Sequence, residues 1–136
     1  MDLALAQAVL GAAVAHADAL GVKLSFSVVD EQGHEVLTLR MDGAPWFTPH
    51  IARTKAQTSC AMRMDTADLA HLDTEHPGLL RVIEEQVGHI VTTLGGGVVV
   101  ATSDGRLLGA VAGSGAHPDQ DAAAARAGAA RWLIDA

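Results

Sequence analysis

Aromatic residues, cysteine and positive charge are all scarce in this chain of 136 residues. Two Trp, two Phe and no Tyr leave few of the rings on which proteins stack single-stranded nucleic acid. The only cysteine is Cys60, which excludes an internal disulfide and suits a reducing compartment. Nine Lys and Arg against sixteen Asp and Glu give a net charge of −7. This balance argues against nucleic acid or an anionic membrane as a partner.

Long apolar runs are missing as well. No stretch of about eighteen apolar residues occurs, and the first twenty residues include Asp2, His16 and Asp18. The sequence therefore predicts neither a membrane span nor a signal peptide, and we expect a cytoplasmic protein. A chain of this length buries about two thirds of its unfolded surface, which is enough for one domain over residues 1–136.

Hydrophobic periodicity predicts an α+β fold. Helices flanking an antiparallel sheet of about five strands are expected, in the order α-β-β-α-α-α-β-β-β-α. Hairpins such as the one closed by Gly33 imply the antiparallel pairing, and Gly21 ends the first helix. The predicted elements are a helix over 1–20, strands over 24–30 and 34–41, a helix over 50–63 opened by Thr48 as N-cap, a short helix ending near Asp73, a helix over 77–88, strands over 90–94, 98–102 and 107–115, and a helix over 118–134.

Histidine is the most frequent candidate for chemistry, with seven copies. His71 and His76 are five residues apart and no His-x-x-x-His pair lies on a predicted helix, so the spacing gives poor support for structural zinc. Haem needs only one axial imidazole. His16 adjoins the apolar stripe of the first helix, His50 lies in the first turn of another and His117 precedes the last. Each of them also has an ordinary interpretation, as a surface or hydrogen-bonded histidine.

The loop after the second strand is a candidate ligand contact. Arg40 ends the strand and is followed by an acidic-glycine turn at Asp42 and Gly43. A guanidinium in this position either clamps a carboxylate or forms a surface pair with Asp42. Trp46 and Phe47, half of all the aromatics, stand together beside this loop.

The next predicted helix carries Lys55, one of only two lysines, which we expect to enter a pocket rather than only solvate a face. Ala52, Ala56 and Ser59 form a line of small residues beside it. Such a line lets a helix approach a sheet or a flat ligand closely.

Two glycine-rich segments complete the candidates. The triplet 95–97 lacks the sequence context of a phosphate loop, and it lets a strand bend or a ligand come close. The segment 113–115 leads into the last helix, whose free N–H groups suit an anion. Asp119 and Asp121 compete with an anion there, because they already lie in the first turn.

These segments together resemble the GlcG/HbpS-like haem-binding family, and the chain is also similar to the C-terminal domain of PduO-type proteins. The resemblance covers essentially the whole chain. It implies a sheet flanked by helices, a homo-oligomer and, in some members, binding or oxidative degradation of haem or a related tetrapyrrole. It also implies that the 40–44 loop, Lys55 and the 113–121 segment form the rim of the pocket. One departure is Val99 after the glycine triplet, where many relatives carry Gly-Gly-x-Pro. The matching residues are 28–30, Gly33, 40–44, 51–52, 55–56, Thr58, 95–97, 104–105, 108–111, 113–115, 120–121 and 125–128.

Three hypotheses follow. In the first, the protein binds haem or a tetrapyrrole through one imidazole, that of His16, His50 or His117, and Arg40, Arg53 or Lys55 pairs with the propionates; His16 is the expected metal ligand. In the second, it is an isomerase or hydrolase of small organic acid or aromatic catabolism: one of the same three cations anchors the carboxylate and His50 or Asp42 moves a proton. In the third, it is a structural subunit.

The expected catalytic residues are His50, Asp42 and Lys55. The expected ligand contacts are Arg40, Gly43, Trp46, Phe47, Arg53, Gly97, Ser114, Gly115, His117 and Asp121.

Overall fold

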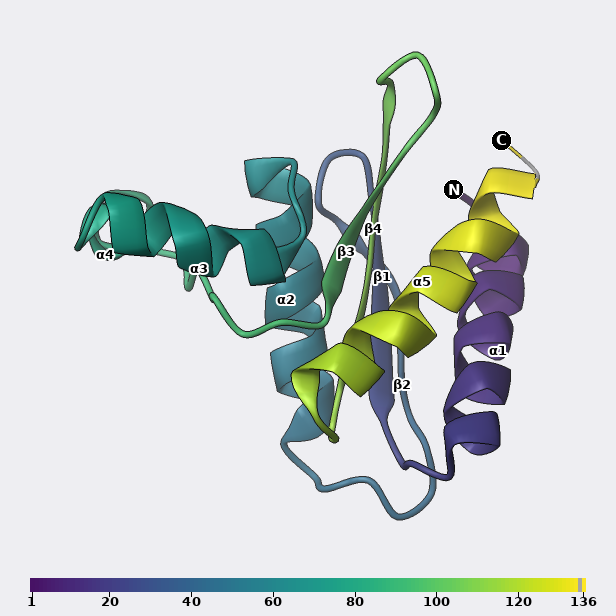
Figure 1. Cartoon of the computed structure of the whole chain (residues 1–136). Helices are drawn as coiled ribbons and strands as arrows, with labels where there is room; N and C mark the ends of the chain where they lie inside the picture. Colours follow the sequence, from purple (N-terminus) through teal and green to yellow (C-terminus); the bar gives the residue numbers. More distant parts are fainter. Residues whose placement is uncertain (135) are drawn as a thin grey trace.

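A computed structural model describes residues 1–134 and 136 of the chain (Figure 1). Within this part of the chain, the helices and strands follow the order α-β-β-α-α-α-β-β-α. The elements are α1 (Leu3–Leu20), β1 (Ser25–Asp30), β2 (Glu35–Arg40), α2 (Thr48–Met62), α3 (Thr66–Glu75), α4 (Leu79–Val87), β3 (Gly97–Ala101), β4 (Leu107–Ser114) and α5 (Pro118–Ile134).

The sheet of the described residues has four strands in the order β2-β1-β4-β3, and every neighbouring pair is antiparallel. The α+β class and the antiparallel pairing are confirmed, whereas the fifth strand predicted over 90–94 is wrong. Side chains, rather than a neighbouring strand, accept the backbone N–H groups of this segment. Val91 N–H donates to Glu84 Oε1 at 2.6 Å and Thr92 N–H to Thr58 Oγ1 at 3.2 Å. Because side chains already accept these backbone N–H groups, they are not available for hydrogen bonds to a neighbouring strand.

Helices cover both faces of the sheet (Figure 1). The size of the side chains distinguishes the two layers. Phe26, Val28 and Val111 lie in one buried cluster with residues of α1 and α5. On the other face the sheet presents Ala110 and Ala112 to α2. The predicted line of small residues on α2 is buried and serves this close helix–sheet contact.

Local signals in the sequence fixed several element ends correctly. Asp2 caps α1, with its Oδ1 accepting the Leu5 N–H at 2.8 Å, and Gly21 ends that helix with a φ of 74°. Thr48 is not the N-cap of α2: Phe47 holds that position. The Thr48 hydroxyl is instead drawn into the fold, bonded to Ser25 Oγ at 2.7 Å and to the Pro45 carbonyl at 2.8 Å.

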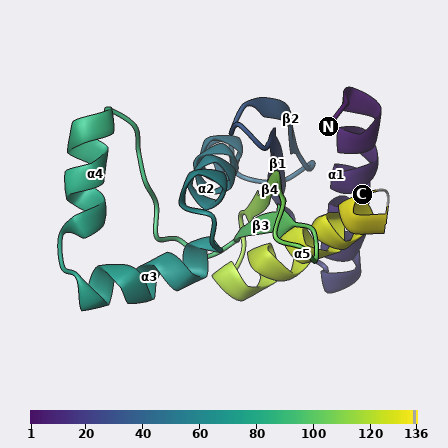
Figure 2. The ribbon, with the colours of Figure 1, turned by 90° about the horizontal axis from the view of Figure 1, so that it is seen from above.

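Helices α3 and α4 form an arm that extends away from the sheet, as Figure 2 shows. The arm and the loop after it expose Val82, Val87, Ile90 and Leu94. A groove of about 450 Å³ separates α4 from α2, with Ile83 and His89 among its walls. The arm and the loop after it therefore carry several of the large apolar side chains that the described chain exposes.

Helix α1 is long and apolar enough, by length and composition alone, to cross a membrane, with a mean hydropathy of 1.5. Core helices of soluble proteins and signal sequences meet the same criterion. In this fold the Ala6, Leu10, Ala13 and Ala17 stripe of α1 is buried in the cluster that joins α1, α5 and the sheet.

Candidate functional site

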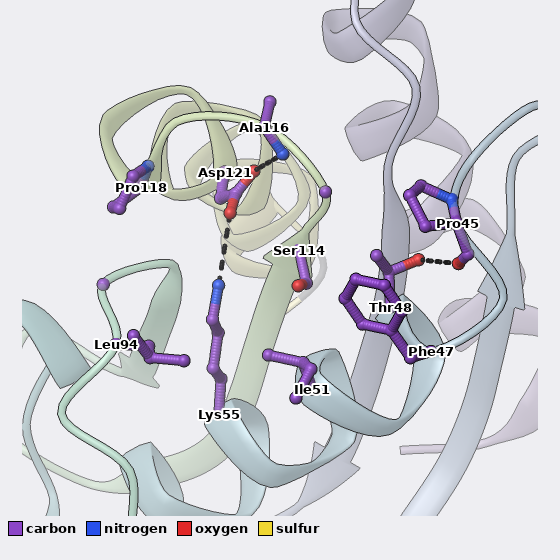
Figure 3. Close-up of a pocket in the computed structure, with 12 residues that line it drawn as sticks. Pro45, Phe47, Thr48, Ile51, Lys55, Leu94, Ser114, Ala116, Pro118 and Asp121 are labelled. Carbon is purple, nitrogen blue, oxygen red and sulfur yellow. Dashed lines mark hydrogen bonds and ion pairs between the residues drawn. The ribbon is translucent and has the colours of Figure 1, made fainter.

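A cavity of about 350 Å³ opens where the start of α2 faces the end of β4 and the first turn of α5 (Figure 3). Phe47, Ile51 and Leu94 give it apolar walls. Ser114 and Lys55 supply polar groups, and the Ser114 hydroxyl points into the cavity (Figure 3). An apolar cavity with a few converging polar groups is typical of a small-molecule site.

A buried ion pair forms the polar end of this cavity. Lys55 is 2% exposed, and its Nζ donates to Asp121 Oδ2 at 3.2 Å and to the Gly113 carbonyl at 2.9 Å. Asp121 is equally buried, and its Oδ1 accepts the Ala116 N–H at 3.0 Å. Asp121 thus fixes both the ammonium of α2 and the backbone that leads into α5.

The charge balance of this pair decides which ligands suit it. Burial lowers the pKa of Lys55, while the attraction of Asp121 acts against this lowering. Because the two charges cancel, an incoming anion gains little from Lys55 and is repelled by Asp121. The carboxylate of Asp121 also occupies the start of α5, where an external anion was one expectation. The site therefore favours a neutral polar group over a carboxylate.

Gly96 makes this arrangement possible. A Cβ placed on it would lie 2.6 Å from the Gly113 carbonyl oxygen and 2.8 Å from Lys55 Nζ. Its φ of 126° is also one that side-chain-bearing residues rarely adopt. The glycine triplet thus allows a close approach, as the sequence suggested, but here the approaching group is the ion pair.

Of the predicted catalytic and ligand-binding residues, five converge on this cavity: Phe47, Lys55, Ser114, Gly115 and Asp121. Trp46 is 82% exposed, with its ring edge-on to Phe47 at a centroid distance of 5.9 Å. Gly97 is buried against Thr66 and the Lys55 carbonyl and does not line the cavity. Thr48, Leu94 and Gly95 also line it. The sequence singled out Gly95 as part of the glycine triplet, where a ligand can come close. It did not predict Thr48 or Leu94 as site residues, and of these two only Leu94, an apolar residue beside the triplet, carried a signal.

The predicted Arg40 loop borders a second cavity of about 400 Å³, lined also by Asp42 and Lys23. Arg40 Nη1 donates to the Ala44 carbonyl at 2.9 Å, which closes the loop around Gly43, a residue with a φ of 88°. The guanidinium therefore already has an acceptor within its own chain.

His50 and Arg53 lie outside the main cavity, near the edge strand β2. Arg53 forms an ion pair with Glu35, and its Nη1 lies 3.3 Å from His50 Nδ1. Hydrogen bonds from Thr38 and Arg53 lower the pKa of Glu35. Arg40 and Arg53 are thus both engaged, so the carboxylate anchors of the enzyme hypothesis do not converge with Lys55.

Two predicted histidines remain. His117 is exposed, and its Nδ1 accepts the Asp119 N–H at 3.1 Å, so it helps to start α5. His16 is half-buried on α1. Among residues 1–134 and 136, no three His, Cys, Asp or Glu side chains are grouped so that they would hold one metal ion.

Cys60 lies away from the cavity. It is buried, its thiol donates to the Asp30 carbonyl at 3.3 Å, and burial raises its pKa. A buried thiol with a raised pKa is a packing residue rather than a nucleophile.

Comparisons with known proteins agree with this fold. The chain is 37% identical over 111 residues to the corrinoid adenosyltransferase PduO of Salmonella typhimurium, which covers 81% of this chain but only 32% of PduO. The crystal structure of a PduOC:heme complex has a TM-score of 0.83 and 32% identity, and the match covers 96% of this chain and 94% of that one. A double mutant of Streptomyces reticuli HbpS gives 0.82 and 32%, covering 96% of this chain and 85% of that one.

A family model decides the relationship. The model described as "Haem degrading protein HbpS-like" matches residues 1–130, which include the sheet, the cavity and most of α5. The chain therefore belongs to the HbpS-like family.

Proposed function

We propose that this protein binds haem or a closely related tetrapyrrole. The observation that carries the proposal is the similarity over 96% of the chain, at 32% identity, to a structure that holds haem, the PduOC:heme complex. The HbpS-like family match supports the same ligand. A protein that binds haem needs to supply one axial ligand to the iron, an apolar surface for the macrocycle and cations for the propionates.

The residues around His16 fit such a ligand. His16 is half-buried, and no hydrogen bond is found for its ring among the described residues. Ala8 and Ala12 precede it on the same side of α1, at helical spacings of four, and are half-buried too. Short side chains beside an imidazole leave room for a flat ring. We therefore propose His16 as the iron ligand, where it would supply an axial nitrogen.

Hemin titration of the purified protein tests this proposal. We expect a shifted Soret band that saturates with hemin. His16→Ala should weaken hemin binding by more than about tenfold, because substitution of a residue that only orients a metal ligand already lowers metal affinity about 10–100-fold. His89→Ala is the matched control, since His89 lies in the apolar groove beside α4 and its Nδ1 is 2.9 Å from the Ile90 carbonyl. Loss of the Soret shift in His89→Ala alone would move the site to that groove. No shift with the unaltered protein would refute haem binding.

We also propose that the protein forms a homo-oligomer through the α3–α4 arm. Val87 and Ile90 are exposed and line the same groove beside α4, and Val82 is exposed on that helix. Exposed apolar patches are typical of association surfaces. Sedimentation should give a mass that is a multiple of the 14.0 kDa chain. The double substitution Val87→Lys/Ile90→Lys should lower this mass, whereas Ser103→Lys in the exposed β3–β4 turn should not. A monomer at all concentrations would contradict the proposal.

A further inference from the structure

We propose that Lys55 condenses with a small neutral aldehyde or ketone bound in the cavity at the start of α2, forming an imine. This activity goes beyond haem binding and involves different residues. The inference starts from a lysine that the haem proposal leaves unused, although it lies at the polar end of an apolar cavity.

The geometry presents the amine to a bound molecule. Lys55 rises from α2 between Ile51 and Leu94 toward Asp121 (Figure 3). Nζ has three hydrogens, and two of them go to the Gly113 carbonyl and to Asp121 Oδ2. The hydrogen bonds of the described residues leave the third for a ligand. The Ser114 hydroxyl, which points into the same cavity, is a second donor for a carbonyl oxygen.

The electrostatics favour a neutral carbonyl compound. The ion pair has no net charge, so it does not attract a carboxylate, but its N–H group still polarises a carbonyl. The walls contributed by Phe47, Ile51 and Leu94 suit a short apolar body. Burial in these surroundings also lowers the pKa of Lys55, which raises the fraction of the nucleophilic neutral amine.

Asp121 provides the proton transfers that the step needs. The ammonium gives a proton to Asp121 Oδ2, 3.2 Å away, and the neutral amine attacks the carbonyl carbon. The new C–N bond forms as the carbonyl oxygen takes up a proton from the same nitrogen, giving a carbinolamine. Asp121 then returns its proton to this oxygen, which leaves as water while the C=N bond forms. The product is a protonated imine that keeps the positive charge beside the Asp121 carboxylate.

Reductive trapping with propionaldehyde and sodium cyanoborohydride tests the inference on the full chain. The chain has only two lysines, so Lys23 is a built-in reference: its side chain is 57% exposed and its Nζ is 3.9 Å from Asp18. After brief treatment, peptide mass spectrometry should find the added propyl group on Lys55 several-fold more often than on Lys23. In urea, where the cavity is lost, the two lysines should be labelled equally.

Two variants separate the proposed chemistry from simple exposure. Asp121→Asn removes the carboxylate that accepts and returns the proton. Although loss of its charge also lowers the pKa of Lys55, labelling of Lys55 should fall several-fold and that of Lys23 stay unchanged, with circular dichroism reporting whether the fold persists. Ile51→Trp, which fills the mouth of the cavity, should reduce labelling of Lys55 while the ion pair remains. Native protein in which Lys23 is labelled at least as much as Lys55 would overturn the inference without any variant. Neither outcome depends on hemin binding, since His16 lies on another helix.

Discussion

Asp121→Asn is expected to lower the free energy of unfolding by about 3 kcal/mol or more, because it leaves the Lys55 ammonium buried without its counter-charge. Asparagine retains an oxygen for the Ala116 N–H, so the substitution removes the charge while keeping the shape. Urea unfolding followed by circular dichroism measures the change as a lower midpoint at an unchanged slope.

The double variant Lys55→Met/Asp121→Asn completes the test. Since both charges are then gone, it should recover much of the stability that Asp121→Asn loses, because a buried ion pair contributes little net stability compared with apolar residues of similar size. Lys23→Met is the matched control at the exposed Lys23–Asp18 pair and should change stability by less than about 1 kcal/mol. If the double variant were as unstable as the sum of its single variants, Lys55 and Asp121 would not be coupled.

Gly96→Ala is expected to destabilise the protein on the order of 3 kcal/mol and to displace Lys55. The backbone φ of 126° costs a residue with a side chain about 1–3 kcal/mol. The added Cβ would also lie 2.6 Å from the backbone oxygen of Gly113, which has little freedom to move because it accepts the Lys55 ammonium. Crowding of this kind adds about 1–3 kcal/mol. Thermal unfolding measures the loss, and reduced trapping at Lys55 would report its displacement.

Gly105→Ala separates the two causes. Gly105 has a φ of 87° in the β3–β4 turn, and a Cβ there would meet nothing within 4 Å. It should therefore show the conformational cost without the crowding, and destabilise less than Gly96→Ala. Equal losses at both glycines would mean that contact with the ion pair contributes nothing.

Most of the fold follows from local rules that the sequence states directly. Asp2 and Gly21 bound α1 because capping depends on a few adjacent atoms, and Gly33 closes the β1–β2 hairpin with a φ of 82° for the same reason. The segment 90–94 was mistaken for a strand because its apolar residues resemble one. Whether a strand forms depends on a partner backbone. Here the side chains of Glu84 and Thr58 accept the N–H groups of Val91 and Thr92 instead.

The family resemblance predicted one pocket rim from the 40–44 loop, Lys55 and the 113–121 segment. The structure brings Lys55 and the 113–121 segment to one cavity and places Arg40 at another. The sequence by itself determined that Lys55 is one of only two lysines and lies beside a line of small residues. It also determined that Asp121 lies in the first turn of the last helix, after a glycine-rich segment. Only the tertiary structure decided that Lys55 and Asp121, 66 positions apart, form a buried ion pair, while Arg40 and Arg53 bind acceptors elsewhere. The physical reason is that a buried charge is costly unless it is paired, and the packing of distant segments decides which partner is available. Here the partners meet because α2 and α5 lie on opposite faces of one sheet and approach each other at its end.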